Sequence, residues 1–193
     1  MYNSHMDSWF INSIFAMLAF GGMQALLKLP AAKGYDKSIY SSLGFIVAAS
    51  LSFVFFRNDI SLDVSTIFYG FVWGSINTVY FLLQMTILKK LDTSTSFPIT
   101  SLGSHVLVVL IGVFIFGDIL SLPQTLALVG TFLLIGFYNH SKKHITLSNG
   151  LIPITLGIIV SSTLIKFIQK IGSASSVAGN YIFWQLFFAA VAS

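Results

Sequence analysis

Four polar or aromatic side chains recur along the apolar run Val64–Leu88 at a helical spacing. They fall at i, i+4, i+7 and i+11, which at about 100° per residue places them in a stripe roughly 60° wide on one helix face. Their side chains can hydrogen-bond a polar solute or join neighbouring helices. Because such a face is unfavourable against lipid, we expect it to line a polar cavity and to bind substrate. The four residues are Trp73, Asn77, Tyr80 and Gln84.

A second candidate face lies in the apolar run Ser96–Phe116, where Ser101 and His105 are one turn apart. Both can hydrogen-bond a substrate, and an imidazole can also titrate near neutral pH, although a neutral structural histidine is the other interpretation. Pro98 is expected in the first turn of the helix, where its missing N–H costs little. Pro98 and Gly103 are predicted to loosen this helix for conformational change.

The run Trp9–Leu27 adds one more candidate substrate ligand, Gln24, which lies one turn before Lys28. Lys28 and Lys166 are interpreted as side chains near helix ends that extend to the membrane interface. On this interpretation neither lysine takes part in the site.

Carboxylates are missing from every apolar run. The chain has no glutamate, and its six acidic residues are aspartates between the runs or at their ends. This argues against a proton pump or hydrolase that relies on an intramembrane carboxylate. The absence of cysteine excludes thiolate metal sites and cysteine nucleophiles. We expect no cofactor, no metal and no enzymatic activity.

Composition identifies the elements that must position these residues. The chain of 193 residues is 55% hydrophobic and 8% charged, with a mean hydropathy of +0.87, as in integral membrane proteins. Its apolar runs have the roughly 20 residues that a helix needs to cross about 30 Å of hydrocarbon. We predict an all-α multi-helix bundle with about seven transmembrane helices, multi-pass in the cell membrane. The runs are Trp9–Leu27, Ile39–Phe56, Val64–Leu88, Ser96–Phe116, Ile119–Tyr138, Leu151–Phe167 and Val177 to the end.

The connections between the runs are too short for a soluble domain, so the function is expected within the bilayer. The expected partners are lipid and a small-molecule substrate, with no nucleic acid and with a homodimer possible. The net charge of +4 is attributed to basic loops that set topology. Most lysines lie after the first, third and fifth runs, and the positive-inside rule would place those loops in the cytoplasm.

The stretch TSTSFPITSLGSHVLVVLIGVFIFGDILSLPQTLALVGTFLLIGFY resembles the end of an EamA-type repeat of the drug/metabolite transporter superfamily. Small residues and Pro98 open it, Gly117-Asp118 stands where the family has a GE-like turn, and Gln124 precedes a glycine and LLIG. The resemblance implies a secondary transporter that works by alternating access. Ten-helix members of the family generally keep both termini in the cytoplasm, which conflicts with the lysine distribution.

A faint internal repeat supports the same family pattern. Shifted by 138 residues, Lys28 meets Lys166 and Gly34 meets Gly172. We therefore expect residues 1–140 to form a first five-helix repeat and residues 141–193 an incomplete, inverted second repeat of two helices. On this expectation the chain is a fragment or a truncated product. Inverted repeats place the substrate near the midplane.

The resemblance also bears on the substrate. Small multidrug-resistance relatives carry a glutamate eight residues before a lysine, but Phe20 and Ile158 stand at those positions here. A neutral or zwitterionic solute is therefore favoured over a cationic drug. Two alternatives are a membrane-embedded lipid-modifying enzyme using Ser101, Ser104 and His105, and a non-transporting assembly subunit or channel.

Overall fold

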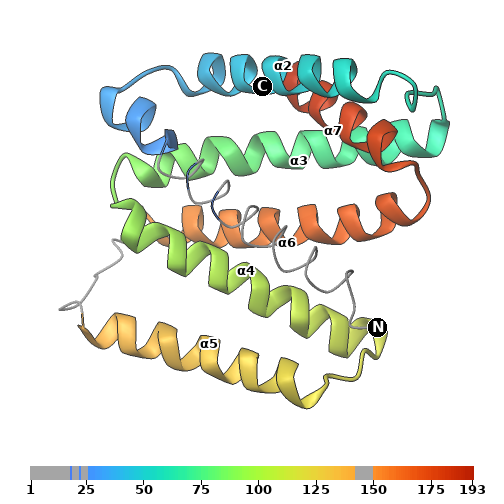
Figure 1. Ribbon diagram of the computed structural model, residues 1–193. Coiled ribbons are helices and arrows are strands. Elements are labelled where there is room, and N and C mark those ends of the chain that lie inside the picture. Colours follow the sequence, from blue (N-terminus) through green and yellow to red (C-terminus); the bar gives the residue numbers. More distant parts are fainter. Residues whose placement is uncertain (1–17, 19–21, 23–25, 142–149) are drawn as a thin grey trace, which may run out of the picture.

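The computed structural model describes residues 18, 22, 26–141 and 150–193, and these residues form helices joined by short connections (Figure 1). Residues 26–33 are the end of one helix. Six of the seven predicted apolar runs coincide with a helix, and the first lies mostly outside the described residues. The helices are α2 (Lys37–Phe56), α3 (Val64–Leu88), α4 (Thr93–Phe116), α5 (Leu122–Ser141), α6 (Ile152–Ala174) and α7 (Ala178–Ala192).

Four of these helices are long and apolar enough to cross a membrane, namely α2, α3, α4 from Thr95 onward, and α6. Shorter apolar stretches occupy Leu122–Leu133 in α5 and the whole of α7. No strand occurs in the described ranges, so the all-α prediction is confirmed for that part of the chain.

Aspartates mark where two of the long helices begin. Asp36 accepts hydrogen bonds from the backbone N–H groups of Ser38 and Ile39, at 2.8 and 3.1 Å, and so caps α2. Asp63 caps α3 by accepting from the Thr66 N–H at 2.9 Å. Hydrogen bonds from the hydroxyls of Ser65 and Thr66 and from that N–H lower the pKa of Asp63 to about 2. The acidic side chains therefore stay outside the apolar helices and stabilise their ends.

Helix α4 ends at a glycine and contains a proline near its start. Gly117 ends the helix in the left-handed region, with φ of 69°, and the Asp118 N–H bonds to the Gly112 carbonyl at 3.0 Å. At the other end α4 begins at Thr93, so Pro98 is its sixth residue and lies in the second turn. The expectation of a first-turn proline is wrong, and Pro98 removes one hydrogen bond inside the helix.

Small polar side chains are inside this bundle, and large apolar side chains cover it. Among the described residues, 14 buried side chains are Ser, Thr, Asn or Gln, whereas 11 are hydrophobic. Many of the buried hydroxyls bond to a carbonyl one turn earlier, as Thr78 does to Gly74 and Thr155 to Leu151. Outer side chains such as Phe55 and Phe114 are 77% and 81% exposed. This distribution is suited to a surrounding lipid phase.

Helix α3 is central to the packing. It packs against α7 and α6, while α2 packs on α7, α4 packs on α6, and α5 lies beside α4 at one edge of the molecule (Figure 1). Helix α6 therefore separates the α2–α3–α7 group from the α4–α5 pair.

The α3–α7 contact is close because α3 presents two glycines to it. A Cβ on Gly70 would lie 2.7 Å from the Trp184 Cβ, and one on Gly74 would lie 2.6 Å from the Ala189 N. One turn further on, the Thr78 hydroxyl lies 3.1 Å from the Ala189 carbonyl oxygen. This GxxxG pattern therefore brings two backbones together.

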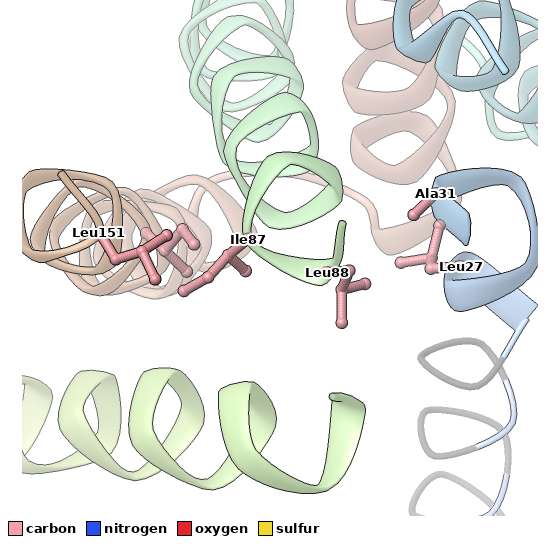
Figure 2. Packing of buried hydrophobic residues seen from close by; sticks show 6 residues of the cluster. Leu27, Ala31, Ile87, Leu88 and Leu151 are labelled. Carbon is pink, nitrogen blue, oxygen red and sulfur yellow. The ribbon is translucent and has the colours of Figure 1, made fainter. Parts of the chain in front are cut away.

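A compact apolar cluster closes one end of the bundle (Figure 2). Leu27 and Ala31 from residues 26–33 lie toward Leu88 at the end of α3, whereas Ile87 lies toward Leu151 at the start of α6. The end of α3 therefore packs against residues 26–33 on one side and against α6 on the other.

Lys28 extends from the same helix end toward the end of α3. Its Nζ donates to the carbonyl oxygens of Leu88 and Leu91, at 2.9 and 3.0 Å, and lies 3.5 Å from Asp92 Oδ1. The ammonium therefore bonds the carbonyl of the last residue of α3 and one in the connection that follows, and it lies at the negative end of the helix dipole. This is a structural role, more specific than extension to the interface.

Substitution of Gly74 tests the α3–α7 contact. We expect Gly74→Ala to lower the free energy of unfolding by about 1–3 kcal/mol, because the added methyl group would overlap the α7 backbone. Gly44→Ala in α2 is the matched control, since a Cβ there meets nothing within 4 Å. Unfolding in detergent, followed by tryptophan fluorescence, measures both variants. Equal stability of the two would contradict close backbone packing at Gly74.

Candidate functional site

Lys166 projects from within α6 toward α4. It lies eight residues, or about 12 Å at 1.5 Å per residue, before the last residue of a 23-residue helix. It is half-buried, its Nζ donates to the Ser104 hydroxyl at 2.8 Å, and it lies 3.4 Å from His105 Nδ1. The expectation that Lys166 lies at a helix end is therefore wrong, because α6 continues to Ala174. Lys166 is a charged group held between two apolar helices.

No described carboxylate pairs with Lys166. The ion pairs in the part of the chain that the structure describes are Lys28 with Asp92, at 3.5 Å, and Lys170 with Asp118, at 3.7 Å. The contacts of Lys166 are instead a hydroxyl and an imidazole. A charge within an apolar helix is costly unless it is compensated, so this position indicates a functional site.

The hydrogen bond of His105 determines which ring nitrogen carries a proton. Its Nδ1 lies 2.6 Å from the backbone carbonyl oxygen of Ser101, one turn earlier in α4. A carbonyl oxygen can only accept, so Nδ1 donates to it. Nδ1 then cannot accept a proton from Lys166, although the two nitrogens are close. The neighbouring hydroxyl of Ser104 also donates to the Ser101 carbonyl, at 2.9 Å, and that side chain is fully buried.

A cleft of about 380 Å³ lies beside Lys166, between α4, the α4–α5 connection and α6. Its volume is in the range of small-molecule sites. Its wall is largely apolar, with a few polar groups from α6 and from the start of α5. The lining residues with polar side chains are Asp118, Gln124, Thr163, Lys166 and Lys170.

A second hollow of about 270 Å³ continues this cleft between α4 and α5. His105 and Thr131 are its polar lining residues that the first cleft does not include, and Gln124 lines both. The Gln124 Oε1 accepts from the N–H and the hydroxyl of Ser121, both at 2.9 Å, as in a capping box at the start of α5. The amide nitrogen is the part of Gln124 that can still donate to a solute.

One end of the cleft is formed where α4 ends. Asp118 follows α4, and its carboxylate pairs with Lys170, one turn beyond Lys166 in α6. The Lys170 ammonium also lies 5.2 Å from the centre of the Phe116 ring, which favours a cation–π contact. Lys170, near the end of α4, is therefore compensated by a carboxylate, whereas Lys166, further from the end of α6, is not.

The substrate ligands predicted from sequence fall into separate groups. His105 lines the second hollow, and Ser101 contributes its carbonyl oxygen to hold the imidazole. Gly103 packs toward α6, since a Cβ there would lie 2.8 Å from the Ile159 Cδ1. Gln24 lies outside the described residues.

The predicted α3 stripe lies away from this cleft. Trp73, Asn77 and Tyr80 are half-buried and Gln84 is fully buried, but neither of the two cavities is lined by an α3 residue. Tyr80 packs against the apolar cluster at the end of α3. The stripe and the His105 region are therefore not brought together in either cavity, and a role of the stripe in substrate binding stays a prediction.

Sequence reasoning missed the polar face of α6. Thr163, Lys166 and Lys170 follow one another at i, i+3 and i+7, the spacing of a single helix face. The same test that singled out the α3 stripe would have found them. A lysine toward the end of an apolar run commonly extends to the interface, so its position in the sequence alone does not assign it to a site.

Comparison with known proteins finds no family model that matches the chain, and no similar curated protein or solved structure.

A double-mutant cycle tests whether Ser104 compensates the Lys166 ammonium. We expect Ser104→Ala to destabilise the protein by about 1–3 kcal/mol, because it removes a hydrogen-bond acceptor from a half-buried charge. The same change in a Lys166→Met background should cost clearly less, since no charge is left without its acceptor. Ser75→Ala is the control, as the Ser75 hydroxyl bonds only to the Phe71 carbonyl in its own helix. Additive effects of the two substitutions on the unfolding free energy would exclude the coupling.

Proposed function

We propose that this protein is a secondary transporter that moves a small polar metabolite across the membrane by alternating access. The observation that carries the proposal is the cleft between α4, α5 and α6, which has polar groups along helices that are otherwise apolar. A polar cavity at membrane depth is where a solute can exchange its hydration for hydrogen bonds from the protein.

In this proposal the solute contacts groups that line the cleft and the second hollow. Lys166 and Thr163 lie on α6, and His105 on α4. Gln124 lies at the start of α5. The volume of about 380 Å³ limits the solute to a small molecule. A neutral or zwitterionic solute remains favoured over a cation, because Lys166 would repel a positive charge.

The helix arrangement offers a route for the conformational change. Helix α5 lies at the edge of the molecule beside α4, whereas α3 packs against both α6 and α7. A displacement of α5 would therefore open the hollow beside His105 without disturbing the close α3–α7 contact. The EamA-type assignment, a first five-helix repeat and a cell-membrane location are parts of this proposal. So are seven spans and a substrate role for Asn77 and Tyr80.

Uptake by proteoliposomes tests the proposal. We expect the purified protein to accumulate at least one of leucine, glucose and uridine above the level of protein-free liposomes. His105→Ala should lower the initial rate at least tenfold for that solute, because the second hollow between α4 and α5 loses its imidazole. Ser42→Ala in α2, remote from the cleft, should leave the rate unchanged. Absence of uptake for all three solutes would overturn the neutral or zwitterionic assignment, and insensitivity to His105→Ala would overturn the site.

One contact favours a membrane-embedded hydrolase as a second candidate. The Ser104 Oγ lies 2.8 Å from the Lys166 Nζ, which is the separation found between a serine nucleophile and a lysine base. Two features oppose it. The Ser104 side chain is fully buried, and its hydroxyl proton is already directed to the Ser101 carbonyl.

Lipid turnover distinguishes the two candidates. The transporter proposal predicts no release of fatty acid or headgroup from phosphatidylglycerol or phosphatidylethanolamine vesicles by the purified protein. Turnover that disappears in Ser104→Ala and persists in Ser75→Ala would replace the transporter proposal with the hydrolase.

A further inference from the structure

We propose that the cleft binds the acidic group of its solute, a carboxylate or a phosphate, with Lys166 as the counter-charge. This inference rests on the proposed transport function and specifies its substrate class. It goes beyond a neutral or zwitterionic preference, because it requires a negatively charged group at a defined position beside α6.

The net charge of the cleft is the first reason to expect an acidic ligand. Lys170 and Asp118 compensate each other at 3.7 Å, whereas Lys166 has no carboxylate partner among the described residues. The charged groups that line the cleft therefore sum to one positive charge, located at Lys166. A ligand with an acidic group would compensate that charge, and a cationic ligand would add to it.

The second reason is that the Lys166 ammonium has more hydrogen-bond donors than its protein neighbours can accept. An ammonium has three donors, and the Ser104 hydroxyl accepts one of them at 2.8 Å. The nearest nitrogen of His105, Nδ1, itself donates to the Ser101 carbonyl. It therefore cannot accept a second hydrogen bond from the Lys166 ammonium. An oxyanion in the cleft would accept the remaining Lys166 donors in charge-assisted hydrogen bonds, which are stronger than neutral ones.

The rest of the wall limits the size and character of the solute. Val108, Ile111 and Phe167 line the cleft beside Lys166 and provide an apolar surface for a short carbon skeleton. At the end of the cleft where α4 stops, Asp118 and Lys170 compensate each other and add no net charge. The chemistry fits a small organic acid, and it also fits the headgroup of an anionic lipid that enters beside α5.

Binding to the full chain in phosphatidylcholine nanodiscs tests the inference. The soluble probes are succinate and inorganic phosphate, with succinamide as the uncharged match, all at constant ionic strength. A separate set of nanodiscs contains phosphatidylglycerol. The unfolding midpoint reports binding, since a ligand of the folded state raises it. We expect a saturable rise with succinate or phosphate and none with succinamide.

Three lysine variants assign that effect to one residue. Lys166→Met should weaken the binding of the acid at least tenfold, and Lys166→Arg should retain it because the charge is retained. Lys90→Met is the control, since Lys90 is exposed after α3 and remote from the cleft. The midpoint without ligand shows whether each variant is folded. If Lys166→Met does not fold, Lys166→Gln takes its place, with the same expected loss.

The outcomes separate the ligand sources and the two proposals. A Lys166-dependent rise only with phosphatidylglycerol supports an acidic site that a lipid headgroup occupies. Equal stabilisation by succinate and succinamide, no response to any acid, or unchanged binding in the Lys166→Met variant would overturn the inference. Uptake of a neutral solute that is unchanged in Lys166→Met would overturn it while leaving the transporter proposal. Lys166-dependent acid binding without uptake of any solute would support the acidic site and overturn the transporter proposal.

Discussion

The physical constraint behind this structure is that apolar helices with an apolar outer surface must satisfy their polar groups inside the bundle. An unpaired donor or acceptor against hydrocarbon costs several kcal/mol, roughly the net stability of many domains. Several buried serines and threonines, such as Ser52 and Thr155, meet this constraint locally, by bonding to carbonyls one turn earlier along the chain. The carboxylates lie in the connections between helices, where Asp36 and Asp63 accept hydrogen bonds that cap α2 and α3.

The two sides of the bundle satisfy this constraint in different ways. On one side, Gly70 and Gly74 let the backbones of α3 and α7 approach, so little space is left between them. On the other side, α5 contacts α4 at the edge of the molecule, and the side chains between α4, α5 and α6 leave a cleft of about 380 Å³. The tightly packed half is suited to be a scaffold, and the less filled half to bind a solute.

The two lysines that align in the faint internal repeat have different surroundings in the folded chain. Lys28 is held by two carbonyl oxygens at the end of α3 and lies near Asp92, so its charge serves the helix end. Lys166 has a hydroxyl partner and an imidazole neighbour beside a cavity. Lys28 therefore has a carboxylate neighbour, whereas Lys166 has none among the described residues.

The sequence by itself determined the helical class and most helix boundaries, because runs of apolar residues, aspartate caps and Gly117 act through the local chain. It also singled out His105, which lines a hollow next to the cleft. The α3 stripe and Lys166 show what the sequence did not predict, namely the neighbours of each polar face. Helical periodicity tells which residues share a face, but not which helix that face meets. Only the tertiary structure decided that Lys166 on α6 bonds to Ser104 on α4, 62 positions away in the chain. It also decided that Asp118 compensates Lys170 and not Lys166.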